Sequence, residues 1–226
     1  MSKMVWLMVW CWLPLVPQLA AEQRIPFDQL SGSERALVKS VTDHATLRRV
    51  YPPRRFTGRL EHFDFLMRNM VATSLLAEQL GLIRYHATWD DQGRVWADNR
   101  LGARGFMQKL HAEQGRYLYY VAGTQRGLFE AHGRGVTLVE AHEPSPQLVE
   151  YRATIWVKVD NAVLDVLTRV FQLFLQGAVD RNFAHVMRHP VTVAQLATTE
   201  TDRVRSAIER LSPEHAEEVR QFSEML

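Results

Sequence analysis

Hydrophobic and polar residues alternate along residues 149–160 in the rhythm of a strand with one buried face. Apolar side chains occupy every second position, namely Val149, Tyr151, Ala153, Ile155, Val157 and Val159. The positions between them are polar, apart from Trp156. Because successive side chains of a strand point to opposite faces, this pattern predicts a long strand with one buried face.

After Asn161 the pattern becomes that of a helix that is apolar around most of its circumference. Its polar positions advance in steps of four, three, four and four, through Asp165, Arg169, Gln172, Gln176 and Asp180. This spacing leaves one narrow polar edge on an otherwise apolar cylinder. Such a helix must be enclosed. A strand that leads into it predicts a helix clasped by an antiparallel sheet, which is a helix-grip arrangement.

The part of the chain before this strand predicts two helices. Ser31 and Glu34 form a Ser-x-x-Glu capping box, which favours a first helix over about residues 33–47. The arginine-rich segment 48–55 contains Pro52 and Pro53, and we predict a stiff linker there. A second helix is expected over 63–80, and Gly81 is its C-terminal stop.

From Ile83 onward, short segments are separated by turn residues. The expected strands are 84–89, 94–101, 106–112, 116–122 and 136–142, followed by the long strand described above. Their hairpin-length connections make the sheet antiparallel. The predicted fold class is α+β, with a sheet of about six strands wrapped around a long C-terminal helix and extra helices at both ends.

Residues 1–21 have the order of a secretory signal peptide. Lys3 precedes an uncharged run over 4–16, and the small residues Ala20 and Ala21 offer a cleavage site. An uncleaved anchor is the alternative. After cleavage the mature chain would contain no cysteine, because Cys11 is the only one. Without disulfides or an Asn-x-Ser/Thr site, the expected location is periplasmic or secreted.

Composition and charge narrow the possible partners. The chain has 226 residues, of which 46% are hydrophobic and 23% are charged, as expected for a globular protein. The formal net charge of +2 is too small to indicate a nucleic-acid partner. The expected organisation is a signal peptide (1–21), an N-terminal helix and Pro/Arg linker (22–60), a main domain (61–195) and a charged helical tail (196–226).

No motif in the chain predicts a catalytic residue, a metal site or a cofactor. Gly133-Arg134-Gly135 is better interpreted as a turn that begins a strand than as part of a nucleotide-binding loop. His185 and His189 have helical spacing, but no third ligand stands at a recognisable distance from them. Four polar residues could supply acid or base groups if they faced a cavity, namely His86, Glu140, His142 and Arg152.

Large apolar side chains gather in the expected sheet and grip helix. They suit the lining of an apolar pocket, but they also fill ordinary cores. The candidate ligand-binding residues are Trp96, Phe106, Tyr119, Tyr151, Ile155, Phe171 and Phe174. Of these, Phe171 and Phe174 lie close together around the expected helix, so we expect them to form one side of the enclosed space with Tyr151 and Ile155.

The order of these elements resembles the START-like (SRPBCC, helix-grip) superfamily. The resemblance is carried by the helix 63–80 with Gly81, the Trp-containing hairpin, the tyrosine-rich strand 116–123, the Gly-Arg-Gly-Val segment at 133–136 and the strand that ends at Val159-Asp160-Asn161. It covers roughly residues 60–190. It implies a curved sheet around the long helix and a cavity for lipids, sterols, polyketides or other apolar compounds. The family's first strand has only 55–61 as a candidate here.

These observations lead to a hypothesis of a non-enzymatic carrier for a hydrophobic, lipid-like small molecule. One alternative is a cyclase or aromatase-type enzyme that uses the same cavity. Another is a protein with a filled core that acts through its surface. In that case the cluster Arg48, Arg49, Arg54 and Arg55 could contact an anionic membrane.

Overall fold

The computed structural model describes residues 24–82, 86–113, 115–126, 130–160 and 168–226, with the side chains of the long helix from Leu175 onward. The predicted signal peptide lies outside these residues. The described chain is α+β and contains one antiparallel sheet of seven strands in the order β1-β7-β6-β5-β4-β3-β2. The strands are β1 Leu47–Thr57, β2 His86–Trp89, β3 Val95–Asp98, β4 Ala103–Glu113, β5 Arg116–Arg126, β6 Glu130–Ser145 and β7 Leu148–Val159.

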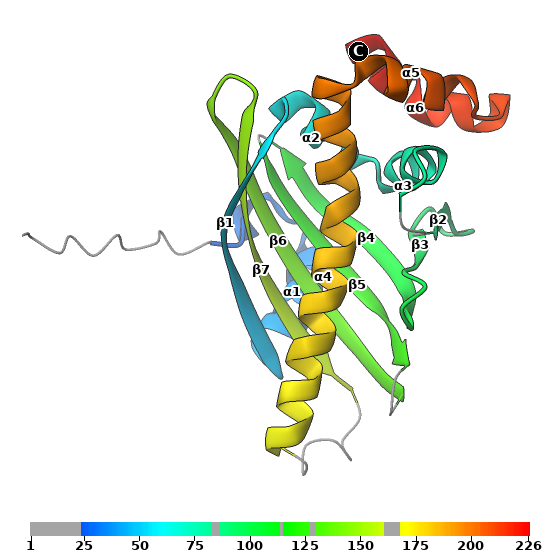
Figure 1. The fold of residues 1–226 in the computed structure, drawn as a ribbon. Helices are drawn as coiled ribbons and strands as arrows, with labels where there is room; N and C mark the ends of the chain where they lie inside the picture. Colours follow the sequence, from blue (N-terminus) through cyan, green and yellow to red (C-terminus); the bar gives the residue numbers. More distant parts are fainter. Residues whose placement is uncertain (1–23, 83–85, 114, 127–129, 161–167) are drawn as a thin grey trace, which may run out of the picture.

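Helices cover both faces of this sheet (Figure 1). They are the 3-10 helix η1 Phe27–Gln29, α1 Gly32–Thr42, α2 Leu60–Arg68, α3 Met70–Gln79, α4 Thr168–Thr199, α5 Thr201–Glu209 and α6 Pro213–Met225. The long helix α4 runs along the concave face, and α1 lies behind the opposite face. The predicted long helix enclosed by the sheet therefore corresponds to α4, and the helices expected at both ends are present.

Strand β7 confirms the long strand that the alternation of apolar and polar residues predicts. Val149, Tyr151, Ala153 and Ile155 are buried and belong to the main core between the sheet and the helices on its concave side. Trp156 on the opposite face belongs to a second core, which packs against Val38 and Val41 of α1. The centre of the sheet is thus buried on both faces. This explains why the apolar Trp156 stands at a position where the alternation favours a polar residue.

The prediction of a linker at 48–55 is wrong. These residues belong to β1, which pairs with β7 from Leu47↔Val157 to Thr57↔Leu148. The register shifts between Tyr51 and Arg54, where Pro52 and Pro53 stand. Proline is tolerated there because β1 is an edge strand with a neighbour on one side only. The sheet consequently has seven strands rather than about six, and it begins before the expected domain boundary at residue 61.

The predicted helix boundaries agree in part. The capping box at Ser31 and Glu34 is formed, although α1 already ends at Thr42. The helix expected over 63–80 is divided into α2 and α3 at Asn69, whose φ of −124° and ψ of 72° are not helical. Gly81 has a φ of +70° and follows the end of α3, as expected for a C-terminal stop.

Three glycines lie side by side across the concave face, and this feature was missed in the sequence. Gly105 of β4 is paired with Gly123 of β5, which is paired with Gly133 of β6. A Cβ atom on Gly105 would lie 2.6 Å from the Cα atom of Gly123, and one on Gly123 would lie 2.8 Å from the Cα atom of Gly105. Side chains cannot be accommodated at these distances, so only glycine permits this close approach of the strands. Gly133 lies inside β6, not in a turn that begins it.

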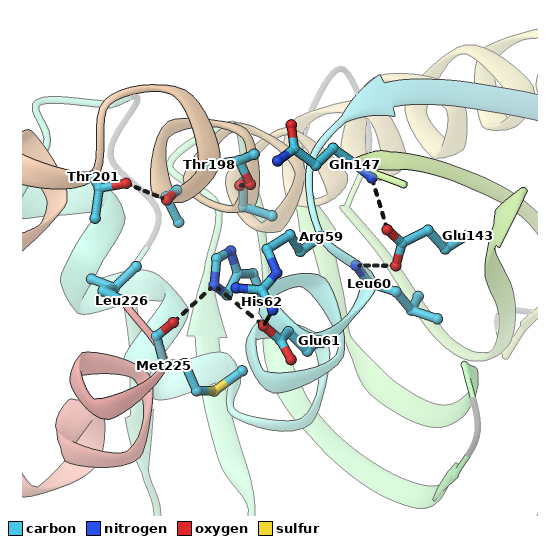
Figure 2. A network of polar contacts seen from close by, with 12 residues as sticks. Arg59, Leu60, Glu61, His62, Glu143, Gln147, Thr198, Thr201, Met225 and Leu226 are labelled. Atoms are coloured by element: carbon cyan, nitrogen blue, oxygen red, sulfur yellow. Dashed lines mark hydrogen bonds and ion pairs between the residues drawn. The ribbon is translucent and has the colours of Figure 1, made fainter. Parts of the chain in front are cut away.

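The charged tail expected over 196–226 is helical, and the apolar faces of α5 and α6 are part of the main core. Val204, Ala207, Val219 and Phe222 are fully buried in that core. Figure 2 shows how the end of α6 meets the start of α2, where His62 faces the carbonyl oxygen of Met225 and the carboxylate of Glu61. The imidazole of His62 is 2% exposed, and its ring centroid lies 5.6 Å from that of Phe222. Burial lowers the pKa of His62, although the contact with the Met225 carbonyl opposes this shift.

Replacement of Gly123 by alanine should destabilise the protein because its Cβ would collide with the backbone of β4. We expect a loss of about 1–3 kcal/mol in the free energy of unfolding, measured by urea denaturation. Gly32→Ala is the matched control, since no atom lies within 4 Å of a Cβ at that position. An equal effect of the two substitutions would contradict a close approach of β4 and β5.

The protein should lose stability as the pH falls below about 6.5, partly through His62. Because the fold lowers the pKa of His62 from 6.5, the unfolded chain takes up a proton first and acidification favours unfolding. Melting temperatures at about pH 7.5 and about pH 5.5 should therefore differ less in His62→Gln than in the wild type. The exposed His44 provides the control His44→Gln. If both variants keep the full wild-type difference, His62 does not contribute to it.

Candidate ligand cavity

A cavity of about 310 Å³ lies between the concave face of the sheet and α4. Its floor is formed by β4, β5, β6 and β7, and its roof by the α4 residues Leu175, Ala178, Val179, Asn182, Phe183, Val186 and Met187. Met67 and Met70, on α2 and α3, complete the wall. This volume falls at the lower end of the range for small-molecule sites in proteins.

The space exists because small residues are concentrated around it. The three paired glycines line the floor, and the other glycine and alanine residues in the lining are Ala97, Ala103, Ala122, Ala131, Gly135 and Ala178. Larger apolar residues such as Val139, Ile155 and Val157 line the rest of the floor. The cavity therefore has a predominantly apolar surface, and its space follows from the short side chains on the sheet.

Only some of the predicted ligand-binding residues meet in this cavity. Tyr119 and Ile155 line it, and the hydroxyl of Tyr119 donates a hydrogen bond to the carbonyl of Met67. Phe106 also contributes to the lining, but its ring packs 6.2 Å from Tyr120 in the core on the α1 side and lies under the guanidinium of Arg94. Of the four predicted aromatic residues whose side chains the structure describes, Phe106 and Tyr119 therefore line the cavity.

Two further predicted residues, Trp96 and Tyr151, lie outside this lining. Trp96 is 41% exposed on β3. Tyr151 is buried beside the rings of Phe56 and Phe63 and takes no part in the lining. The side chains of Phe171 and Phe174 lie outside the described residues. Sequence analysis missed the paired glycines and Asn182, and the only available signal was the repeated occurrence of glycine inside strand-like segments.

The acid and base candidates of the enzyme hypothesis do not face the cavity. Glu140, His142 and Arg152 lie on the opposite face of the sheet and line a separate polar groove of about 490 Å³. There the carboxylate of Glu140 accepts hydrogen bonds from both Arg116 and Arg152, with each closest ion-pair distance at 2.9 Å. The fourth candidate, His86, is exposed on the edge strand β2.

The arginines of the expected basic cluster do not form one surface. Arg55 pairs with Glu150, and the guanidinium of Arg48 lies 5.7 Å from the ring centroid of Trp156. Arg49 projects to the other side of β1 and pairs with Asp180 of α4 at 2.6 Å. Because β1 is a strand, its consecutive side chains point to alternate faces, which separates the charges.

Asp180 fastens α4 to the edge strand. Its carboxylate accepts hydrogen bonds from Arg49 and from the hydroxyl of Tyr51, which donates over 2.7 Å. The Tyr51 ring also stacks on Phe183, with centroids 4.2 Å apart. Burial would raise the pKa of Asp180, but these hydrogen bonds outweigh burial and lower it. Asp180, which belongs to the polar edge predicted for the helix, therefore has a structural role, because it joins α4 to β1.

The described residues contain no cluster of three or more His, Cys, Asp or Glu side chains that could hold a metal ion. His185 and His189 lie side by side in α4, with their ring centroids 5.2 Å apart.

Among the helices described here, none combines the length and the apolar character that crossing a membrane requires.

Comparison with known proteins does not assign a family. No family model and no curated protein matches this chain. Among solved structures, it is similar to the crystal structure of a conserved protein from Geobacillus kaustophilus. That match has 10% sequence identity and a TM-score of 0.48, and it covers 67% of this chain and 97% of the other. This similarity supports no conclusion about function.

Replacement of Asp180 by alanine should destabilise the protein by removing the contact between α4 and β1. We expect a loss of about 1 kcal/mol, because the ion pair is partly exposed and solvent screens it. Asp202 offers a control, since its side chain is 99% exposed in a helical pair with Arg205. Chemical denaturation should give a lower free energy of unfolding for Asp180→Ala than for Asp202→Ala. Equal values would contradict a stabilising contact at Asp180.

Proposed function

We propose that this protein binds an apolar small molecule in the cavity between the sheet and α4 and acts as a carrier. The observation that carries the proposal is the apolar space of about 310 Å³ between the small residues of the sheet and the α4 residues above them. An ordinary core is close-packed and leaves few voids larger than a water molecule. A space of this size is favourable to fill with an apolar ligand, because its walls then gain dispersion contacts.

The architecture is consistent with a helix-grip fold, in which a curved antiparallel sheet encloses a long C-terminal helix. This supports the proposed relation to the START-like superfamily, whose members hold lipids, sterols or polyketides in the corresponding space. Export to the periplasm through residues 1–21 completes the proposal. A periplasmic carrier of this kind would keep a hydrophobic molecule out of water between membranes.

The cyclase or aromatase alternative receives less support. An enzyme of that type requires an acid and a base that reach a bound substrate. Three of its four candidates lie in the polar groove on the opposite face, so they are separated from the cavity by the sheet. Contact with an anionic membrane also receives less support, because the arginines of β1 point to both faces of the sheet.

Substitution of Ala178 by leucine tests whether the cavity is a binding site. Ala178 lines the cavity, so a leucine there should occupy the space and abolish binding of an uncharged, apolar fluorescent probe such as N-phenyl-1-naphthylamine. Stability should change by less than about 1 kcal/mol, whereas overpacking of a filled core costs about 1–3 kcal/mol.

The control for this experiment is Ala72→Leu. Ala72 is fully buried in α3 within the main core and does not line the cavity. The Ala72→Leu variant should be destabilised by overpacking, while the probe still binds in its cavity. If Ala178→Leu destabilises as strongly as Ala72→Leu, and the wild type binds no probe, the cavity is filled core and the proposed function is wrong.

A further inference from the structure

Three side-chain amides form a hydrogen-bonded row at one side of the cavity. The Nδ2 atom of Asn99 donates to Oδ1 of Asn182 over 2.7 Å, and Nδ2 of Asn182 donates to Oε1 of Gln125 over 2.7 Å. Asn99 belongs to the loop after β3, Gln125 to β5 and Asn182 to α4. All three residues line the cavity. The row therefore places polar atoms at a defined position in an otherwise apolar lining.

Backbone groups fix the direction of this row at both ends. The Oδ1 atom of Asn99 accepts hydrogen bonds from the backbone N–H groups of Leu101 and Ala103, at 2.8 and 2.9 Å. Nε2 of Gln125 donates to the backbone carbonyl of Arg126 at 2.8 Å. An amide flip would place donor against donor or acceptor against acceptor. The orientation of the Asn182 amide is thus determined by its neighbours.

After these two bonds, Asn182 retains one N–H on Nδ2 and one acceptor position on Oδ1. A donor and an acceptor on adjacent atoms match a hydroxyl group, which can accept from the N–H and donate to the oxygen. A carboxylate can only accept, so it would leave the oxygen of Asn182 unpaired. An unsubstituted hydrocarbon would leave both amide positions without a partner.

Charged groups near the rim of the cavity do not reverse the preference for a hydroxyl group over a carboxylate. Arg134 lines the cavity but is held by Asp160 at 2.6 Å. Arg104 and His132 also line it, and both are exposed residues. A charge that is accessible to water is screened and contributes little to the binding of an anion. The neutral polar anchor is the amide row, in which Asn99 is 4% exposed and Asn182 and Gln125 are half-buried.

We infer that the cavity selects an apolar molecule that carries a hydroxyl group, and that Asn182 is the residue that binds this hydroxyl. This inference rests on the proposed function and specifies its ligand class. It makes Asn182 a specificity-determining residue, while the small residues of the floor leave room for the apolar body.

The experiment compares three probes with one ring system, namely naphthalene, naphthol and naphthoate. Their affinities are measured at neutral pH by intrinsic fluorescence or calorimetry, for the wild type, Asn182→Leu and Gln195→Leu. Gln195 is the matched control, because it is exposed on the same helix and lies outside the cavity lining. Thermal denaturation establishes that each variant is folded, and Asn182→Ala replaces Asn182→Leu should the latter fail to fold.

The wild type and Gln195→Leu should bind naphthol at least as tightly as naphthalene, and naphthoate most weakly. Asn182→Leu should weaken naphthol about tenfold relative to naphthalene, as expected for loss of a buried hydrogen bond. If the wild type prefers naphthalene, or the naphthol-to-naphthalene ratio is unchanged in Asn182→Leu, the inference is wrong while the cavity remains a binding site. If no probe binds the wild type, the proposed function itself fails.

Discussion

The close approach of β4 and β5 at their paired glycines is the constraint on which the rest of the structure depends. Gly105 and Gly123 bring the backbones of β4 and β5 together on the concave face, where a Cβ atom on either would collide with the other strand. Gly133 of β6 continues the row of glycines. The same absence of side chains leaves space above the sheet. One local feature therefore gives the sheet its close strand contacts and the cavity its floor.

The roof of the cavity is held in place from both sides. Asp180 connects α4 to β1 at one edge, and Asn182 connects it to β5 and to the loop after β3 on the other side. Both residues are polar, although α4 covers an apolar face. These contacts position the helix by directed hydrogen bonds and reduce its dependence on close packing. A helix fixed in this way can lie above a space without collapsing into it.

Much of the architecture could be predicted from local pattern, because alternation in β7 and the capping box at Ser31 depend on near neighbours in the sequence. Strand β1 could not, since Pro52 and Pro53 are acceptable only on an edge strand and pairing with β7 is a tertiary property. The cavity was harder to predict from the sequence. The aromatic residues suggested a pocket, but its floor is defined by glycines. The alignment of these glycines across strands depends on the register of the sheet.

The central claim is that an empty, apolar space separates the glycine-lined floor from α4. Crystallography of the protein under xenon pressure tests it most directly, because xenon occupies empty apolar cavities. The account predicts xenon density between the concave face near Gly123 and Ala178, in a site bordered by Val157. Side chains that fill this region, with no xenon bound there, would contradict the account.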